Sequence, residues 1–164
     1  MGGGILPVAI RKGVPYFLFS RETVDGAGRD RGLWSDFGGA KEPGESDYQT
    51  ALREGHEESS GIIGSPETIR KLVRDRLIKK IKTKYYTSYL VRIRYNRHLP
   101  SRFSRRYRAV RRDTPELIAK DGLYEKDKLR WVSINNLTKH RQMFRPWYRY
   151  IVDRIILAFD DEKS

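Results

Sequence analysis

The sequence predicts a mixed α/β fold, of the α/β or α+β class, built as a single domain. Strand-like and helix-like segments follow one another along 164 residues, a length that suits one domain. No repeat, low-complexity tract or Pro/Gly/Ser-rich linker divides the chain. We therefore expect one domain over residues 1–164, with a sheet that is not wholly parallel.

The first forty residues favour strands separated by one long loop. Residues 5–10 and 16–20 predict two strands joined by a turn at residues 12–13. Residues 24–32 contain three glycines and two aspartates, which indicates a loop. Residues 34–39 predict a short strand that ends in two glycines.

A helix is predicted immediately after the loop at residues 40–45. Ser46 or Asp47 can cap its start, and we expect it to run to about Ser60. Gly61 stands where a helix commonly stops.

The second half of the chain predicts further strands and helices. Residues 70–84 and 85–95 favour strands, since apolar residues partly alternate with basic ones and Tyr, Val and Ile are frequent. Residues 100–112 are rich in arginine and compatible with a helix, and residues 129–134 predict another strand. A closing helix begins at Pro146, and we expect a frayed tail over residues 160–164.

The composition excludes several classes of protein. There is no cysteine, so disulfides and thiolate metal sites are excluded. No apolar run approaches the roughly 20 residues that span a bilayer, and the start lacks a signal-peptide pattern. We expect a cytoplasmic protein, with the nucleus as the alternative; the oligomeric state stays open.

The balance of charge is strongly basic. Lys and Arg number 34 against 21 Asp and Glu, a formal net charge of +13. Such a field favours polyanionic partners, among them nucleic acid, polyphosphate and anionic membrane surfaces. The alternative is a basic surface with no special ligand.

Three glutamates stand on one turn of the predicted helix. Glu54, Glu57 and Glu58 are three and four residues apart, so they share a face. Their like charges repel, and a hard divalent cation such as Mg²⁺ or Mn²⁺ would cancel that repulsion. Arg53 can steady one carboxylate, and the turn at Gly38 can offer a backbone carbonyl. The alternative is a solvated acidic helix face.

The spacing around these glutamates resembles the Nudix box, Gx5Ex7REUxEExGU, in which U is a bulky aliphatic residue. Six residues of residues 39–61 fall in register with it: Gly39, Glu45, Arg53, Glu54, Glu57 and Glu58. Two positions depart from the pattern. Gly55 replaces the first aliphatic residue, either to make room for a bulky neighbour or because the enzyme is damaged. Ser60 takes the place of the terminal glycine, which we interpret as a helix end shifted by one residue.

The resemblance implies an α/β/α sandwich with a mixed sheet and a hydrolase of phosphoric anhydride bonds. It implies that Glu54, Glu57 and Glu58 hold Mg²⁺ or Mn²⁺ with the Gly38 carbonyl, and that Arg53 orients a carboxylate. In the box, Glu45 would brace the turn between loop and helix and Gly39 would be structural.

A distant glutamate is also implied as metal ligand or base. Glu125, six residues before Trp131, matches that placement, with Glu116 in reserve. Metal ions would neutralise phosphate charge and activate water, and Glu54 or Glu125 would take the proton. The catalytic candidates are therefore Arg53, Glu54, Glu57 and Glu125.

Two basic and aromatic clusters are candidates for substrate binding. The first cluster lies in residues 102–112 and contains six arginines beside Phe103 and Tyr107. We expect Arg102, Arg105, Arg106 and Tyr107 to contact the phosphates and the rest of the substrate, because guanidinium groups bind phosphate and aromatic faces stack on bases. The second is the basic run of residues 70–84, which leads into Tyr85, Tyr86 and Tyr89. The alternative for each is a solvated basic face beside core tyrosines.

Three functions remain open. The first is removal of the 5′ cap of RNA, favoured by the net charge and the first arginine cluster. The second is hydrolysis of a small polyanion, such as a dinucleoside polyphosphate, a nucleotide sugar or a diphosphoinositol phosphate. The third is a catalytically weak Nudix fold that binds RNA.

Overall fold

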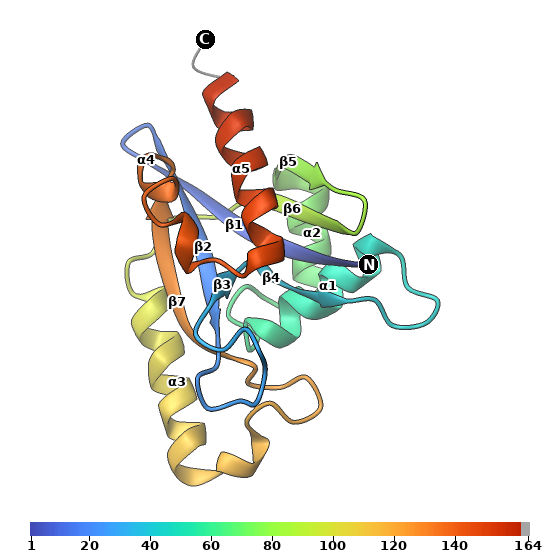
Figure 1. Ribbon diagram of the computed structural model, residues 1–164, viewed down its shortest axis with the longest axis vertical. Coiled ribbons are helices and arrows are strands. Elements are labelled where there is room, and N and C mark those ends of the chain that lie inside the picture. The colour runs from blue at the N-terminus through green and yellow to red at the C-terminus, as the bar shows by residue number, and fades with distance from the viewer. Residues whose placement is uncertain (162–164) are drawn as a thin grey trace.

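The computed structural model describes residues 1–161 and confirms the predicted α/β/α sandwich with a mixed sheet (Figure 1). The described residues form seven strands: β1 (Gly2–Arg11), β2 (Val14–Glu22), β3 (Trp34–Ser35), β4 (Phe37–Ala40), β5 (Leu77–Lys82), β6 (Tyr86–Arg92) and β7 (Lys126–Ser133). Their helices are α1 (Asp47–Glu58), α2 (Pro66–Arg76), α3 (Leu99–Asp113), α4 (Ile134–Leu137) and α5 (Pro146–Asp161).

Strand β1 organises the sheet. It pairs in parallel with β6 along most of its length, and its other edge is divided between two antiparallel partners. Its first half, Gly2 to Ile5, pairs with β4, and its second half, Val8 to Arg11, pairs with β2. The β2 strand continues outward to β7 and β3, while β6 continues to β5. The strand that leads into α1, β4, is thereby held against β1, the middle strand of the sheet.

Side chains alternate between the two faces of the sheet, as strand geometry requires. Leu6 and Val8 point to a core shared with α5, whereas Ile5 points to a core shared with α1 and α2. Phe17 and Phe19 of β2 join the α5 side, where Phe17 packs edge-on against Phe159. Figure 1 accordingly shows α5 on one side of the strands and α1 and α2 on the other.

The prediction of a strand from residue 70 was wrong, because helix α2 occupies that stretch as far as Arg76. Ser65 caps the helix by accepting from the Thr68 amide, and a proline occupies its first turn. Ile69 and Val73 lie four residues apart and are its buried positions. The strand β5 begins only at Leu77. The partial alternation of basic and apolar residues concealed a helix whose apolar face is narrow.

The predicted strand at residues 34–39 is interrupted at Asp36. Trp34 and Ser35 pair with β2, whereas the chain from Phe37 pairs with β1. Asp36 is fully buried at the break and accepts hydrogen bonds from the hydroxyls of Tyr86 and Ser88, both at 2.7 Å. Burial raises the pKa of Asp36 to about 6.

The predicted helix that carries the box is confirmed as α1. Ser46 and Gln49 form a reciprocal capping box at its start. Its last residue is Glu58, and both Ser60 and Gly61 then adopt left-handed backbone, with φ of 51° and 76°. Ser60 thus takes up the conformation that the glycine of the box pattern would adopt.

At the C-terminus, Asp160 and Asp161 belong to α5, so the prediction of fraying was wrong for these two residues. The rest of that predicted tail, residues 162–164, lies outside the described residues. Among the helices of residues 1–161, none is long and apolar enough to cross a bilayer.

Gly55 is explained by packing. A Cβ atom built on it would lie 2.8 Å from Cγ1 of Ile5 and 3.3 Å from Cδ1 of Ile69. The bulk that the box pattern supplies from α1 is supplied here by neighbours on β1 and α2. Tight packing of this kind leaves no room for a methyl group.

We predict that Gly55→Ala lowers the free energy of unfolding. Alanine favours a helix by about 1 kcal/mol relative to glycine, but overpacking costs about 1–3 kcal/mol. In an Ile5→Ala background, where Cγ1 is absent, the same substitution should stabilise the protein. Urea denaturation of the four proteins in this cycle measures the coupling, and an equal effect of Gly55→Ala in both backgrounds would contradict this account.

Candidate active site

The acidic face of α1 lies where the sheet's central strand meets β4. Glu54 and Glu58 are largely buried, with side chains 12% and 3% exposed, whereas Glu57 is 31% exposed. Burial raises the pKa of Glu54 against the opposing effect of Arg53, and burial raises the pKa of Glu58 well above its usual range. The face therefore combines three like charges with little solvent.

Arg53 holds this face together. Its guanidinium donates two hydrogen bonds to Glu45, at 2.8 and 3.0 Å, through Nε and Nη2. Its Nη1 reaches Glu54 at 2.8 Å and Glu57 at 3.2 Å. Because Arg53 hydrogen-bonds to Glu45, the pKa of that carboxyl falls to about 2. One cation thus joins the loop before α1 to two of the three carboxylates.

Glu58 points to the opposite side, into the sheet. Its Oε2 accepts from the Gly38 amide at 2.9 Å and lies 3.5 Å from Nζ of Lys126. Gly38 therefore lies against the acidic face, as the sequence suggested, although it is the amide of Gly38 that contacts Glu58. Its carbonyl as a metal ligand stays a prediction.

Lys126 was not identified from the sequence. It is fully buried, and its ammonium group donates to Glu22 and to the Ser35 hydroxyl in addition to its pairing with Glu58. Arg145 continues the network, donating to Glu22 at 3.0 Å and to Asp30 at 2.8 Å. One sequence signal could have pointed to Lys126: it directly follows Glu125 and lies just before the predicted strand of residues 129–134, at a position that alternation can turn toward the core. A lysine at an inward position is unusual, because lysine is rarely buried without a partner.

Glu125 lies at the edge of the same site. It lines a hollow of about 490 Å³ together with Glu22 and Arg145, and its charge acts on Glu54 and Glu58. The loop before it passes close to α1, since a Cβ on Gly122 would lie 3.5 Å from Oε2 of Glu57. The reserve candidate, Glu116, is exposed on a short 3-10 helix, Pro115–Leu117.

Gly39 allows the closest approach of backbone to the acidic face. A Cβ atom there would lie 2.5 Å from Oε1 of Glu54 and 2.6 Å from its carboxyl carbon. A side chain at this position would displace Glu54, so the glycine is required by contact rather than by an unusual backbone angle.

The donor set suits a hard divalent cation after a small rearrangement. Within residues 1–161, no three acidic or histidine side chains already converge as a metal shell, and the carboxylates are paired with Arg53 and Lys126. The donors are oxygens, as Mg²⁺ prefers, and the buried charge on Glu54 and Glu58 is what a cation would neutralise. Binding would require Glu54 and Glu57 to turn away from Arg53.

The first basic cluster is divided by the structure. Arg102, Arg105 and Arg106 lie exposed on α3, and Arg106 donates to the Ser60 carbonyl at the end of the box helix. The prediction for Tyr107 needs correction, because its ring is buried at 5% exposure and its hydroxyl is bonded to Thr23 and Asp25. A buried ring cannot stack on a base.

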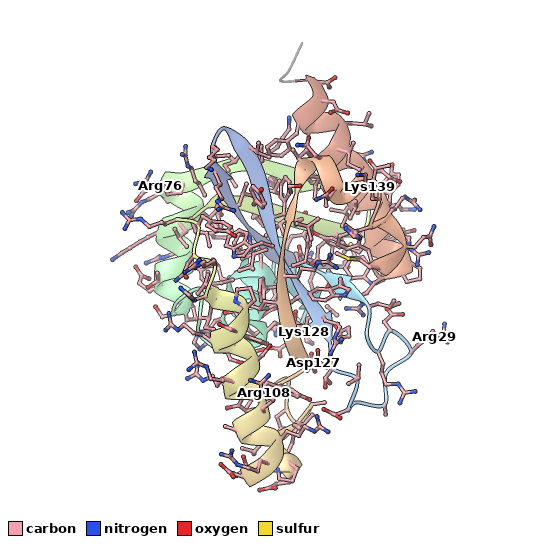
Figure 2. The ribbon with its side chains drawn as sticks, turned by 90° about the vertical axis from the view of Figure 1, so that its left-hand side faces the viewer. Arg29, Arg76, Arg108, Asp127, Lys128 and Lys139 are labelled. Atoms are coloured by element: carbon pink, nitrogen blue, oxygen red, sulfur yellow. The ribbon has the colours of Figure 1, made fainter. Side chains whose placement is uncertain are left out.

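The second basic cluster is also divided. Of its tyrosines, Tyr86 and Tyr89 are buried, and Tyr85 is exposed. Positive side chains are spread over several elements, as the separated positions of Arg29, Arg76, Arg108 and Lys139 show in Figure 2. The positive charge is therefore spread over several elements and is not confined to one patch.

Comparison with solved structures identifies the fold. A Nudix hydrolase from M. smegmatis, RenU, is similar with a TM-score of 0.54 and 16% identity, over 97% of this chain and 85% of that one. A C. elegans Ap4A hydrolase in a binary complex is similar with a TM-score of 0.53 and 13% identity, over 97% and 96% of the two chains. No family model matches the sequence, and no curated protein matches it. At these identities the likeness shows that the chain has the Nudix hydrolase fold.

We predict that Glu45→Gln destabilises the protein in a pH-dependent way. Because the pKa of Glu45 is lowered from 4.5 to about 2, its ionised form stabilises the fold above pH 4.5. That contribution is lost as the pH falls toward 2. The variant should therefore unfold at lower denaturant concentration than the wild type at pH 7, and the difference should shrink between pH 4.5 and 2.

Glu116→Gln is the control for this measurement, since Glu116 is exposed and forms no ion pair within residues 1–161. A difference between Glu45→Gln and the wild type that stays constant over this pH range would show that Arg53 does not act through the charge of Glu45.

Proposed function

We propose that the protein is a divalent-metal-dependent hydrolase that cleaves a phosphoric anhydride bond in a nucleoside-diphosphate-linked substrate. The observation that carries this proposal is the set of three glutamates on one turn of α1, two of them buried, beside Gly38 and Gly39. Arg53 pairs with Glu54 and Glu57, and Lys126 pairs with Glu58. Burying like-charged carboxylates costs stability even when Arg53 and Lys126 pair with them, and the site keeps a set of oxygen donors of the kind that a divalent cation binds.

Each residue of the site has a separate role in this proposal. Glu54, Glu57 and Glu58, with the Gly38 carbonyl, would hold Mg²⁺ or Mn²⁺, which neutralises phosphate charge and acidifies water when bound. Arg53 positions Glu54 and Glu57, and Lys126 fixes Glu58. Glu125, which lines the hollow at the edge of the site, would accept a proton from the attacking water, with Glu54 as the alternative base.

The substrate we favour is the 5′ cap of RNA. The support is the row of exposed arginines on α3, Arg102, Arg105 and Arg106, on a helix that contacts the end of α1 through Ser60. Guanidinium groups on an exposed helix suit the phosphates of a chain that extends beyond the site.

A dinucleoside polyphosphate is the second candidate, since one similar structure is an Ap4A hydrolase. The third possibility, an inactive RNA-binding module, loses its main support because Gly55 is explained by the packing of Ile5 and Ile69.

We predict that Glu57→Gln and Glu58→Gln each reduce hydrolysis by more than roughly 100-fold, since changes even in the groups that support metal ligands cost 10- to 100-fold. Titration calorimetry should show Mg²⁺ binding to the wild type and much weaker binding to both variants. Glu57 is partly exposed, so its variant tests the idea without disturbing the core. Glu67→Gln, an exposed change on α2, is the control. Full activity in Glu57→Gln would overturn the proposal.

A substrate panel decides between the two candidates. We expect the protein with Mg²⁺ to release the cap from cap-labelled RNA, and Arg102→Ala/Arg105→Ala to weaken RNA binding and reduce its salt dependence by about one unit of slope per lost phosphate contact. Arg130→Ala/Lys139→Ala removes the same charge from other exposed places, outside both basic clusters. Turnover of diadenosine tetraphosphate without cap release would reject the decapping proposal, whereas the broader proposal of a phosphoric anhydride hydrolase would stand.

A further inference from the structure

We propose that a neutral nucleobase of the substrate binds in a hollow between the N-terminus of α5 and the start of β6, which we call the Trp147 hollow. It has a volume of about 320 Å³, at the lower end of the range for ligand pockets, and its lining includes Gly2, Gly39, Tyr85, Tyr86, Arg145 and Trp147. This inference rests on the proposed function, because it gives the nucleobase of the proposed substrate, which is not the part that is cleaved, a binding site of its own.

The hollow adjoins the acidic face through a single residue. Gly39 lines it, and Gly39 is also the residue that lies against the carboxylate of Glu54. Gly2, opposite Ala40 in the β1–β4 pair, adds a second position without a side chain. Backbone rather than side chain therefore forms this part of the wall, which leaves space for a flat ring within a nucleotide's length of the box.

Two exposed aromatic side chains flank this space. Trp147 is 40% exposed and Tyr85 is 62% exposed, although large aromatic groups are usually covered. The Trp147 ring is held in place, with its centroid 4.8 Å from that of Tyr86 and the Arg145 guanidinium 5.2 Å away. Tyr86 is itself anchored by its hydrogen bond to Asp36. Trp147 is thus a fixed platform on which a base can stack.

Arg145 connects the hollow to the reaction site. Arg145 and Trp147 line both the Trp147 hollow and the larger hollow that contains Glu125. A nucleotide whose base lies against Trp147 would direct its phosphates past Arg145 toward Glu125 and the acidic face. The two pairings of Arg145, with Glu22 and Asp30, keep this guanidinium in position.

The charge of the hollow selects the kind of base. No carboxylate is among its lining residues, whereas Arg145 is, and Lys84 lies over the Tyr85 ring at 5.1 Å. A cationic base, such as 7-methylguanine, would find no carboxylate in the lining to pair with its charge. The hollow therefore suits an unmethylated base: the first nucleotide of a capped RNA, or either base of a dinucleoside polyphosphate.

The test is nucleotide binding without catalysis. In EDTA, calorimetric titration should show AMP and GMP binding to the wild type, with ribose 5-phosphate and 7-methyl-GMP binding much more weakly. Trp147→Ala should weaken AMP binding about 5- to 100-fold, the usual loss when one stacking ring is removed. Trp147→Phe should retain most of the affinity, and Tyr85→Ala should lose part of it.

Tyr150→Ala is the matched control, since Tyr150 is an exposed aromatic residue on α5 outside the hollow. Circular dichroism confirms that each variant is folded. Equal binding of AMP and ribose 5-phosphate, or unchanged AMP affinity in Trp147→Ala, would overturn the proposal. With the hydrolysed substrate, Trp147→Ala should raise KM and leave kcat within a few-fold. If AMP binds but no substrate is hydrolysed, the proposed function would be rejected, while the proposal that the Trp147 hollow binds a nucleobase would stand.

Discussion

The ion pairs of Arg53 are the interaction on which the rest of the site depends. One guanidinium binds Glu45 before the helix and Glu54 and Glu57 within it, so the loop, the helix start and the acidic face form one unit. Like charges on one helical turn repel, and two of these are shielded from water. Arg53 on one side and Lys126 on the other reduce this repulsion through their ion pairs with the carboxylates. A divalent cation could take the place of these ion pairs.

The second constraint is the absence of side chains around the centre of the sheet. Gly39 lets β4 approach the carboxylate of Glu54, and Gly38 lets β4 approach Tyr86 and β1. Gly55 lets α1 approach Ile5 of β1. Close packing leaves helix, strand and loop little freedom to shift relative to one another. Glycine therefore acts here through the contacts it permits and contributes to the precise placement of charged groups.

The acidic face and the Trp147 hollow divide the proposed substrate between two environments. Carboxylates and a buried lysine surround the place of the phosphates, whereas glycine backbone and aromatic rings surround the place of the base. Arg145 lies at the boundary, lining both hollows. The exposed arginines of α3 favour RNA but do not by themselves identify the substrate, since positive side chains are spread over several other elements as well (Figure 2).

The sequence by itself determined the fold class and the helix of the box, because a spacing of three and four residues on a capped helix is a local property. The sequence did not reveal that residues 70–76 belong to a helix. The buried face of α2 is narrow, with Ile69 and Val73 as its buried residues, and an even spacing of two apolar residues fits a strand as well as a helix. Tyr107 looked available in sequence, but packing buried its ring. Lys126 and Arg145 reach the site from β7 and the start of α5, far along the chain from α1, so only tertiary contact reveals that they balance its charge.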